Sequence, residues 1–283
     1  MKKKFSKIVA AFAFIVLTST FIYAQKISAE EQKIIDYIDS QTESAVALLE
    51  KTVNIESPTE NTAGVKQVGM IFKNEFESLG FTAKWIEMPA EMKRAGHLTA
   101  ERAGTKGKRI LLIGHIDTVL KGEKFRRDGK KAYGTGSADM KTGNVVLYYA
   151  LKALHETGAL RDVSIIVHLT GDEEDSGTPL EISRGDLIAA AKRSDLVLSF
   201  ENGGSNIATV ARRGYSDWQL EVTAKTGHSS GIFKESMGSG AIFEASRIIN
   251  QFYETLRGEK YLTFNPAMIA GGTELEIKSG GVT

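Results

Sequence analysis

The sequence contains no cysteine. The chain can therefore form neither a disulfide framework nor a metal site built on thiolates. Structural zinc of the cysteine-rich kind is excluded, and any bound metal ion must be held by histidine, aspartate or glutamate.

An excess of charge of either sign is also missing. The 36 basic and 35 acidic residues nearly cancel. Removal of residues 1–24 takes four lysines away, which leaves 32 basic against 35 acidic side chains and a net charge of −3. This balance gives no reason to expect nucleic acid or an anionic membrane as a partner. The apolar and charged fractions, 42% and 25%, are those of a soluble globular protein.

The first 24 residues have a pattern of their own. Four lysines within the first seven residues precede an apolar run over residues 8–23. These are the n-region and h-region of a secretory signal peptide, with cleavage expected after Ala24. A transmembrane anchor is the alternative, but the run is short for a span and is polar at residues 18–20. We therefore predict a signal peptide over residues 1–24 and a secreted or periplasmic protein, with no membrane association after cleavage.

Alternating helical and strand patterns in the rest of the chain indicate an α/β sheet protein. Helical spacing of apolar residues occurs over 30–53, 62–79, 144–156, 180–192 and 240–257. A strand is expected at 81–88, and the polar segment 90–107 is expected to form a hairpin with the strand before His115. Residues 121–131 are expected to be a solvated basic loop. Residues 214–225 have strand composition, and a domain boundary is expected near Val210.

One stretch combines a buried-strand pattern with a cluster of acids. Residues 163–177 read V-S-I-I-V-H-L-T-G-D-E-E-D-S-G, so that an apolar run is followed by four consecutive acids. A run this short and apolar is typical of a strand buried on both faces of a parallel sheet. Ligand crevices of open α/β sheets lie at the carboxyl ends of such strands. Four adjacent anions repel one another unless a cation lies among them, although a solvated acidic loop would have the same composition.

Two further stretches end in the same way. Residues 109–118, R-I-L-L-I-G-H-I-D-T, form an apolar strand followed by His115 and Asp117. Residues 195–204, D-L-V-L-S-F-E-N-G-G, form another that leads to Glu201. Three strands that deliver metal-capable side chains to one edge of a sheet predict a single site there.

A glycine-rich turn contributes a fourth candidate residue. Residues 133–143, Y-G-T-G-S-A-D-M-K-T-G, have neither the dinucleotide-binding spacing nor a Gly-Lys-Ser/Thr phosphate loop. The turn therefore does not predict nucleotide binding. It places Asp139 close to the start of a helix, where the side chain can face the crevice.

These donors predict a metal centre with four ligands, His115, Asp139, Glu174 and Glu201. Oxygen and imidazole donors suit zinc, with manganese or cobalt as alternatives. Because four ligands exceed what one open catalytic zinc needs, we expect two Zn²⁺ per subunit, about 3.5–4 Å apart and bridged by Asp139.

Two more acids have predicted roles beside the metals. Metal ions lower the pKa of a bound water, but a base must still take its proton. Glu173, next to Glu174 in a non-helical turn, is predicted to be that base. Asp117, two residues after His115, is predicted to hold the second nitrogen of the imidazole. The other histidines before the boundary are predicted to be structural: His97 in a polar loop, His155 on a helix and His168 within a strand.

The ordered motifs G-H-I-D-T, G-S-A-D-M-K-T-G, G-D-E-E-D-S-G and S-F-E-N-G-G resemble those of the dizinc exopeptidase and aminoacylase family. The similar members are of the carboxypeptidase G (glutamate carboxypeptidase) and succinyl-diaminopimelate desuccinylase type. The resemblance implies that His115 and Glu201 bind one metal, that Glu174 binds the other and that Asp139 bridges both. It implies that Glu173 is the general base and acid. It also implies a cis peptide bond after Asp139.

The resemblance implies two domains. Residues 25–210 are expected to form the catalytic domain, a mixed, largely parallel sheet flanked by helices. Residues 211–283 are expected to be part of a smaller α/β lid through which relatives dimerise, so a homodimer is expected. His228, in T-G-H-S-S, matches the lid histidine that reaches the partner's active site and steadies the oxyanion.

Relatives of this kind also continue to a final histidine ligand and to an arginine that binds the substrate carboxylate. No histidine follows His228 in this sequence. We therefore expect a C-terminally truncated sequence that is poorly active by itself.

The expected reaction is hydrolysis of an amide bond next to a free carboxylate, in a peptide or an N-acyl amino acid, with Glu173 activating a water. An N-acyl amino acid deacylase or desuccinylase of the same family is one alternative. A non-catalytic binding protein on a degenerate or truncated fold is the other.

Overall fold

The computed structural model describes residues 27–203, 207–272, 277–278 and 281–282. The chain divides into two units, Met1–Ser205 and Asn206–Thr283, which are described separately. The predicted signal peptide, residues 1–24, lies outside the described residues. Within the described ranges, no helix is both long and apolar enough to cross a membrane.

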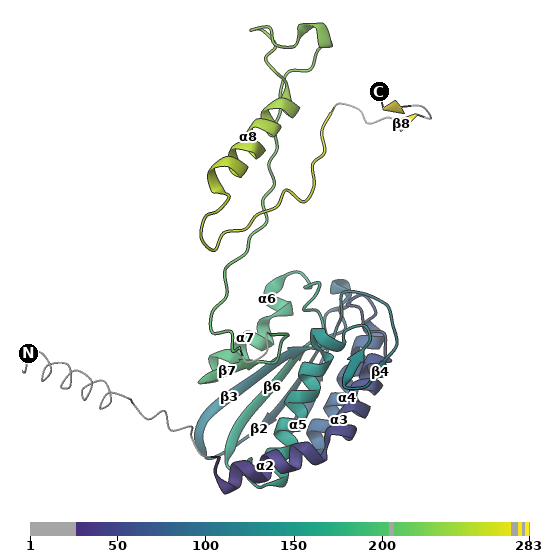
Figure 1. The fold of residues 1–283 in the computed structure, drawn as a ribbon, viewed down its shortest axis with the longest axis vertical. Helices are drawn as coiled ribbons and strands as arrows, with labels where there is room; N and C mark the ends of the chain where they lie inside the picture. The colour runs from purple at the N-terminus through teal and green to yellow at the C-terminus, as the bar shows by residue number, and fades with distance from the viewer. Residues whose placement is uncertain (1–26, 204–206, 273–276, 279–280, 283) are drawn as a thin grey trace, which may run out of the picture. The chain divides into compact units, whose positions relative to one another are not determined.

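A mixed sheet of five strands forms the centre of the first unit (Figure 1). The strands lie in the order β1-β2-β6-β3-β7, with the bounds β1 Thr82–Ile86, β2 His97–Arg102, β3 Lys106–His115, β6 Val163–Thr170 and β7 Leu196–Ser199. β2 pairs antiparallel with β1 and β6, whereas β3 pairs parallel with β6 and β7. The predicted α/β fold is confirmed, and the parallel part of the sheet carries the predicted site.

Helices flank the sheet, with the bounds α2 Ala29–Ser40, α3 Thr42–Val53, α4 Thr62–Ser78, α5 Thr142–Glu156, α6 Leu180–Ser183 and α7 Gly185–Lys192. The predicted helices 30–53 and 180–192 are each divided in two, at Gln41 and Arg184. Ser28 and Glu31 form a capping box that starts α2. α4 packs on β1 and β2, α5 packs on β3, and α7 packs on β6.

Both faces of β3 and β6 are covered, as the apolar runs predicted. Successive side chains of a strand point to opposite faces of the sheet. Leu112 and Val167 belong to the main core on one face. Leu111 and Ile166 pack with Ala190 of α7 on the other face. Burial on both faces explains the continuous apolar runs at residues 110–113 of β3 and 165–167 of β6.

The predicted hairpin between residues 90–107 and the His115 strand is wrong. This segment contains the 3-10 helix η1 Ala90–Met92 and strand β2, and β6 lies between β2 and β3. The polar composition of this segment gave no sign of a buried strand. Its polar side chains can be buried because they have hydrogen-bond partners. Thr99 donates to the carbonyl of Val167 at 3.3 Å, and the His97 ring bonds the Ser183 carbonyl at 2.8 Å.

The basic segment 121–131, expected to be a loop, contains a strand. β4 Arg126–Asp128 pairs antiparallel with β5 Lys131–Tyr133. The guanidinium of Arg126 lies over the Tyr133 ring at 3.9 Å from its centroid, and Arg127 forms an ion pair with Glu43 at 2.7 Å.

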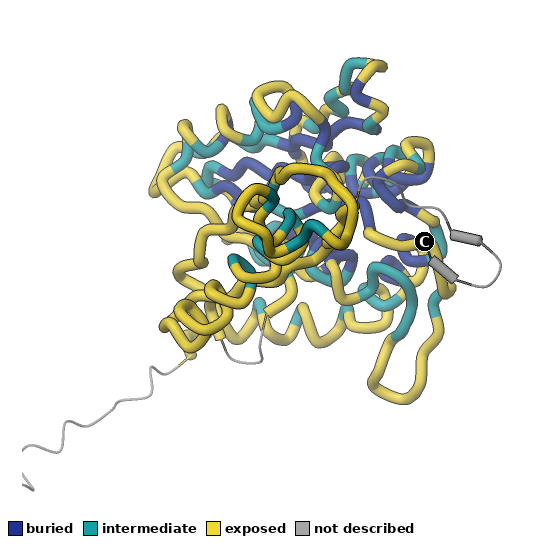
Figure 2. Tube along the Cα trace, turned by 90° about the horizontal axis from the view of Figure 1, so that it is seen from above, coloured by how far each residue is buried: buried dark blue, intermediate teal, exposed yellow. Residues whose placement is uncertain are grey.

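The second unit contains the 3-10 helix η3 Ser229–Gly231, the helix α8 Ala241–Leu256, and the short strands β8 Ile277–Lys278 and β9 Gly281–Val282. α8 agrees with the predicted helix. Residues 214–225 form no strand, because no other described segment pairs with their backbone. None of residues 207–272 is buried, and Figure 2 colours the buried residues within the first unit.

Two of the histidines predicted to be structural lie together inside the sheet. The rings of His97 on β2 and His168 on β6 are buried, with centroids 5.5 Å apart. His97 also accepts a hydrogen bond from the Gly171 N–H at 3.1 Å, but neither ring nitrogen of His168 has a hydrogen-bond partner among the described residues. Burial first, and then the His97 ring and the Arg184 charge, lower the pKa of His168 to about 3, although Asp172 opposes them.

A neutral His168 makes the stability of the protein sensitive to acid. Because the folded-state pKa lies below the ordinary value of 6.5, the unfolded chain takes up the proton first as the pH falls. The contribution of His168 to the free energy of unfolding is fully present above about pH 6.5, and about 2 kcal/mol of it is lost by pH 5. Measured by urea denaturation, the free energy of unfolding of the His168→Leu variant is expected to fall by about 2 kcal/mol less than that of the wild type between pH 7 and pH 5.

The matched control for this prediction is His155→Leu, at a partly exposed position of α5. It should keep the wild-type difference between the two pH values. An unchanged pH dependence in the His168→Leu variant would contradict the assignment of acid sensitivity to this ring.

Candidate metal centre

The carboxyl ends of β3, β6 and β7 meet at one edge of the sheet, as their parallel pairing requires. His115 is the last residue of β3 and pairs with Thr170, the last residue of β6. Ser199 at the end of β7 pairs with Ile113, and Glu201 follows two residues later. The three predicted segments therefore come together.

His115 lies at the centre of the site. Its side chain is 1% exposed. Its Nε2 atom is 3.0 Å from Oδ1 of Asp139 and 3.3 Å from Oε1 of Glu201. On the other side of the ring, Nδ1 is 3.1 Å from the carbonyl oxygen of Asp117 and 3.3 Å from its Oδ1. The imidazole is thus held between three carboxylates.

Asp139 comes from η2 Ser137–Lys141, the irregular turn before α5, and is followed by the cis peptide bond that the resemblance implied. The turn is attached to β3 at two places. The His115 N–H donates to Sδ of Met140 at 3.1 Å, and the amide of Asn144 donates to the His115 carbonyl at 2.6 Å. A Cβ atom at Gly143 would collide with the Phe200 carbonyl, so glycine permits this close approach to the segment before Glu201.

The four consecutive acids after β6 have different surroundings. Asp172 is fully buried and accepts from Arg184 at 2.5 Å, from the Ser183 hydroxyl at 2.6 Å and from the Gly177 N–H at 2.9 Å. Asp175 forms an ion pair with Arg94 at 2.6 Å. Two of the four negative charges are therefore neutralised by arginines.

Sequence reasoning missed both arginines. The run of four acids indicated that cations must lie nearby. However, Arg94 and Arg184 occur in segments without a motif, and only the folded chain brings them to this loop.

The remaining two acids, Glu173 and Glu174, are held through their backbone by Asp117. The Glu173 N–H donates to Oδ1 of Asp117, and the Glu174 N–H donates to Oδ2, each at 3.1 Å. The Thr59 hydroxyl also donates to Oδ2, at 2.7 Å. Burial raises the pKa of Asp117, but the hydrogen bonds from His115 and Thr59 outweigh this effect. The pKa is therefore lowered, and this carboxyl is ionised.

The electrostatics of the cluster favour a cation. Burial lowers the pKa of His115, but the hydrogen bond and charge of Asp117 and the charge of Glu201 raise it to about 9. Burial, together with the charges of Asp139 and Glu173, raises the pKa of Glu174 to about 7. Burial also raises the pKa of Glu201. A metal ion would take the place of the bound protons, because metals and protons compete for the same donor atoms.

The donor atoms fall into two groups that fit metal ions. His115, Asp139 and Glu201 each offer one ligand atom within 4.8 Å of the others, and so do His115, Glu173 and Glu174. All four predicted ligands therefore lie in these groups, and Glu173 joins them. Asp139 is grouped with Glu201 and not with Glu174. Its predicted bridging role stays a prediction.

His228 lies in the second unit, at the start of η3. Its Nδ1 atom accepts the Ser230 N–H at 3.2 Å and lies 3.0 Å from the Ser230 hydroxyl. These contacts are local to the turn. The predicted role of His228 at a partner's active site stays a prediction.

Comparison with known proteins finds relatives that match most of the chain. The chain is 32% identical over 277 residues to carboxypeptidase G2 from a Pseudomonas species, a match that covers 95% of this chain and 65% of that protein. It is 30% identical to succinyl-diaminopimelate desuccinylase from Ralstonia nicotianae over 206 residues, 65% of this chain and 51% of that protein. The chain thus spans between half and two thirds of the length of these relatives.

The fold has counterparts among solved structures. The crystal structure of human carnosine dipeptidase 1 aligns with a TM-score of 0.51 at 18% identity, over 59% of this chain and 40% of that one. At this identity the likeness shows the fold alone. The sequence profile of peptidase family M20/M25/M40 matches residues 111–274, which include every predicted metal ligand. On this match the chain belongs to the M20/M25/M40 peptidase family.

Proposed function

We propose that this protein is a metal-dependent hydrolase that cleaves the amide bond next to a free carboxylate in peptides or N-acyl amino acids. The observation that carries the proposal is the buried imidazole of His115 held between the carboxylates of Asp139, Glu201 and Asp117 at 3.0–3.3 Å. Membership of a peptidase family supports the amide bond as the target.

The donor set fits zinc. His115, Asp139 and Glu201 would hold one ion, and Glu174 would contribute to a second. Manganese and cobalt accept the same donors. When bound, such ions polarise the substrate carbonyl and acidify a water molecule.

The protein's own residues would handle the protons. The Glu173 carboxylate is exposed, lies within 4.8 Å of the His115 nitrogen, and is fixed at its backbone by Asp117. It is therefore suited to take the proton of the attacking water and to pass it to the leaving nitrogen. Asp117 accepts from Nδ1 of His115, which orients the ring so that Nε2 faces the ligand group.

The names of the relatives suggest two classes of substrate. The relative with 95% coverage of this chain is named a carboxypeptidase, which favours a carboxy-terminal residue of a peptide, as in glutamate carboxypeptidases. Relatives named acetylornithine deacetylase and succinyl-diaminopimelate desuccinylase favour N-acyl amino acids as the second candidate. Both classes present an amide next to a carboxylate, so one site can serve either.

Metal removal tests the proposal. The full gene product should hydrolyse either dipeptides with a carboxy-terminal acidic residue or acetyl and succinyl amino acids. A chelator should lower the rate at least about 100-fold, because the ions stabilise the transition state by several kcal/mol. Added Zn²⁺ should restore the rate. Hydrolysis that survives exhaustive chelation would overturn the metal-dependent assignment, and tight ligand binding without turnover would favour a non-catalytic binding protein.

Three further properties remain proposals. The pattern of residues 1–24 supports export of the protein to a secreted or periplasmic location. The resemblance of residues 211–283 to a lid supports a homodimer. The match of His228 to a lid histidine supports its role in steadying the oxyanion.

A further inference from the structure

Residues 52–59, here called the 52–59 turn, connect the end of α3 to the segment before α4 and contain none of the proposed metal ligands. The turn nevertheless contacts two of the three segments that supply ligands to the His115–Asp139–Glu201 group. One contact is made to the end of β3 and the other to η2. The sequence marks a turn at Ser57-Pro58, but no metal-binding or catalytic motif includes it.

The contact with the end of β3 is made by Thr59 and its neighbours. The Thr59 hydroxyl donates to Oδ2 of Asp117 at 2.7 Å, and the two side chains are 3% and 0% exposed. The backbone adds two bonds, since the Thr118 N–H donates to the Ser57 carbonyl at 2.9 Å and the Thr59 N–H donates to the Thr118 carbonyl at 3.3 Å. The Asp117 carboxylate, which touches His115, is thereby fixed from outside the strand.

The contact with η2 is made by a buried ammonium group. Nζ of Lys141 donates to the carbonyls of Thr52 at 3.0 Å and Ile55 at 2.9 Å, and the residue is 1% exposed. The Thr52 carbonyl lies in the last turn of α3 and the Ile55 carbonyl two residues beyond its end, where the helix dipole favours a cation. Lys141 follows Asp139 by two residues, so the ammonium fixes the segment that carries this ligand.

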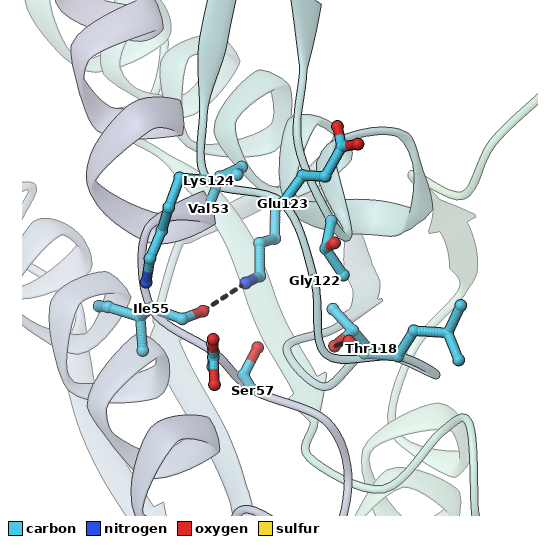
Figure 3. A pocket seen from close by; sticks show the side chains of 11 residues that line it. Val53, Ile55, Ser57, Thr118, Gly122, Glu123 and Lys124 are labelled. Carbon is cyan, nitrogen blue, oxygen red and sulfur yellow. Dashed lines mark hydrogen bonds between the residues drawn. The ribbon is translucent and has the colours of Figure 1, made fainter.

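Figure 3 shows Ile55, Ser57 and Thr118 around one small pocket, where a dashed line marks the hydrogen bond to the Ile55 carbonyl. The two contacts therefore converge on one short piece of chain. A metal centre tolerates only small errors in the placement of its ligands, about 0.5 Å. His115 and Asp139 come from different segments, so a common anchor sets their separation.

We propose that the 52–59 turn positions His115 and Asp139 relative to each other, and that Thr59 and Lys141 are the positioning residues through which it acts. The inference rests on the proposed metal centre and adds residues that touch no metal ion. Thr59 acts through Asp117 on the imidazole. Lys141 acts through the η2 backbone on the Asp139 carboxylate.

The test compares Thr59→Val, which keeps the shape and removes the hydroxyl, with Thr59→Ser, which keeps the hydroxyl. Co²⁺ serves as the probe in titrations of the whole chain, read by its visible absorption, and urea denaturation of the chelator-treated proteins reports stability separately. Thr59→Val is expected to bind Co²⁺ about tenfold more weakly with an altered spectrum, and Thr59→Ser is expected to bind like the wild type. Lys141→Met should weaken binding in the same direction.

Thr99→Val is the matched control, because it also removes the hydroxyl of a buried threonine. The Thr99 hydroxyl donates to the Val167 carbonyl within the sheet and contacts none of the predicted metal ligands. It should leave Co²⁺ affinity and spectrum unchanged. Equal Co²⁺ affinity and spectrum in wild type, Thr59→Val and Lys141→Met would overturn the positioning role alone. Failure of the wild-type chain to bind Co²⁺ would overturn the proposed metal centre and this inference with it.

Discussion

Glu173→Ala is expected to lower the turnover number of the full gene product by about 10²–10⁴-fold, the usual contribution of a positioned general base. The physical reason is the placement of the side chain. Its carboxylate lies beside His115 and Glu174, its backbone N–H is held by Asp117, and the group is exposed to the solvent that supplies the water. Metal content, measured by atomic emission on the purified variant, is expected to stay at the wild-type value.

Two comparisons sharpen this prediction. Glu181→Ala, which removes an exposed acid eight residues further along the chain, should leave turnover unchanged. Glu174→Ala and Asp139→Ala should lose metal as well as activity. Because Glu173 shares a group of donor atoms with His115 and Glu174, a Glu173→Ala variant that loses metal would be reassigned from base to ligand.

Arg184→Leu is expected to destabilise the protein by about 3–5 kcal/mol, because it leaves a buried carboxylate without its counter-ion. Asp172 is fully buried, and the Arg184 side chain is 20% exposed, so solvent does little to screen the pair. Arg184 also donates to the Asp172 carbonyl at 3.0 Å and to the Ser176 hydroxyl at 2.6 Å. The loop that carries Glu173 and Glu174 therefore loses several attachments at once. Urea denaturation at neutral pH measures the effect.

The surface pair of Arg193 and Glu101 provides the control, because its side chains are 46% and 40% exposed. Arg193→Leu should change the free energy of unfolding by less than about 1 kcal/mol. Combining Arg184→Leu with Asp172→Asn should recover part of the loss, since the uncompensated charge is then removed. A cost for Arg184→Leu as small as that for Arg193→Leu would show that the pair does not hold the loop.

The sequence by itself determined the parts of this protein that depend on local pattern. Continuous apolar runs marked β3 and β6 as strands buried on both faces, and parallel strands must bring their carboxyl ends to one edge. The grouping of His115 with Glu174 and with Glu201 could be predicted for that reason, whereas Asp139 was indicated by the glycine-rich turn before a helix. The absence of cysteine limited the donors to oxygen and imidazole.

The tertiary structure alone decided which distant side chains support those residues. Strand β2 was hidden because its polar side chains find partners on β6 and α6, which no local window contains. Thr59 lies 58 residues from Asp117, and Arg94 lies 81 residues from Asp175. Arg184 lies 12 residues from Asp172. Hydrogen bonds act over about 3 Å in space and carry no signal along the chain. Motifs can therefore indicate the ligands of this site, whereas only the folded chain shows what holds them in place.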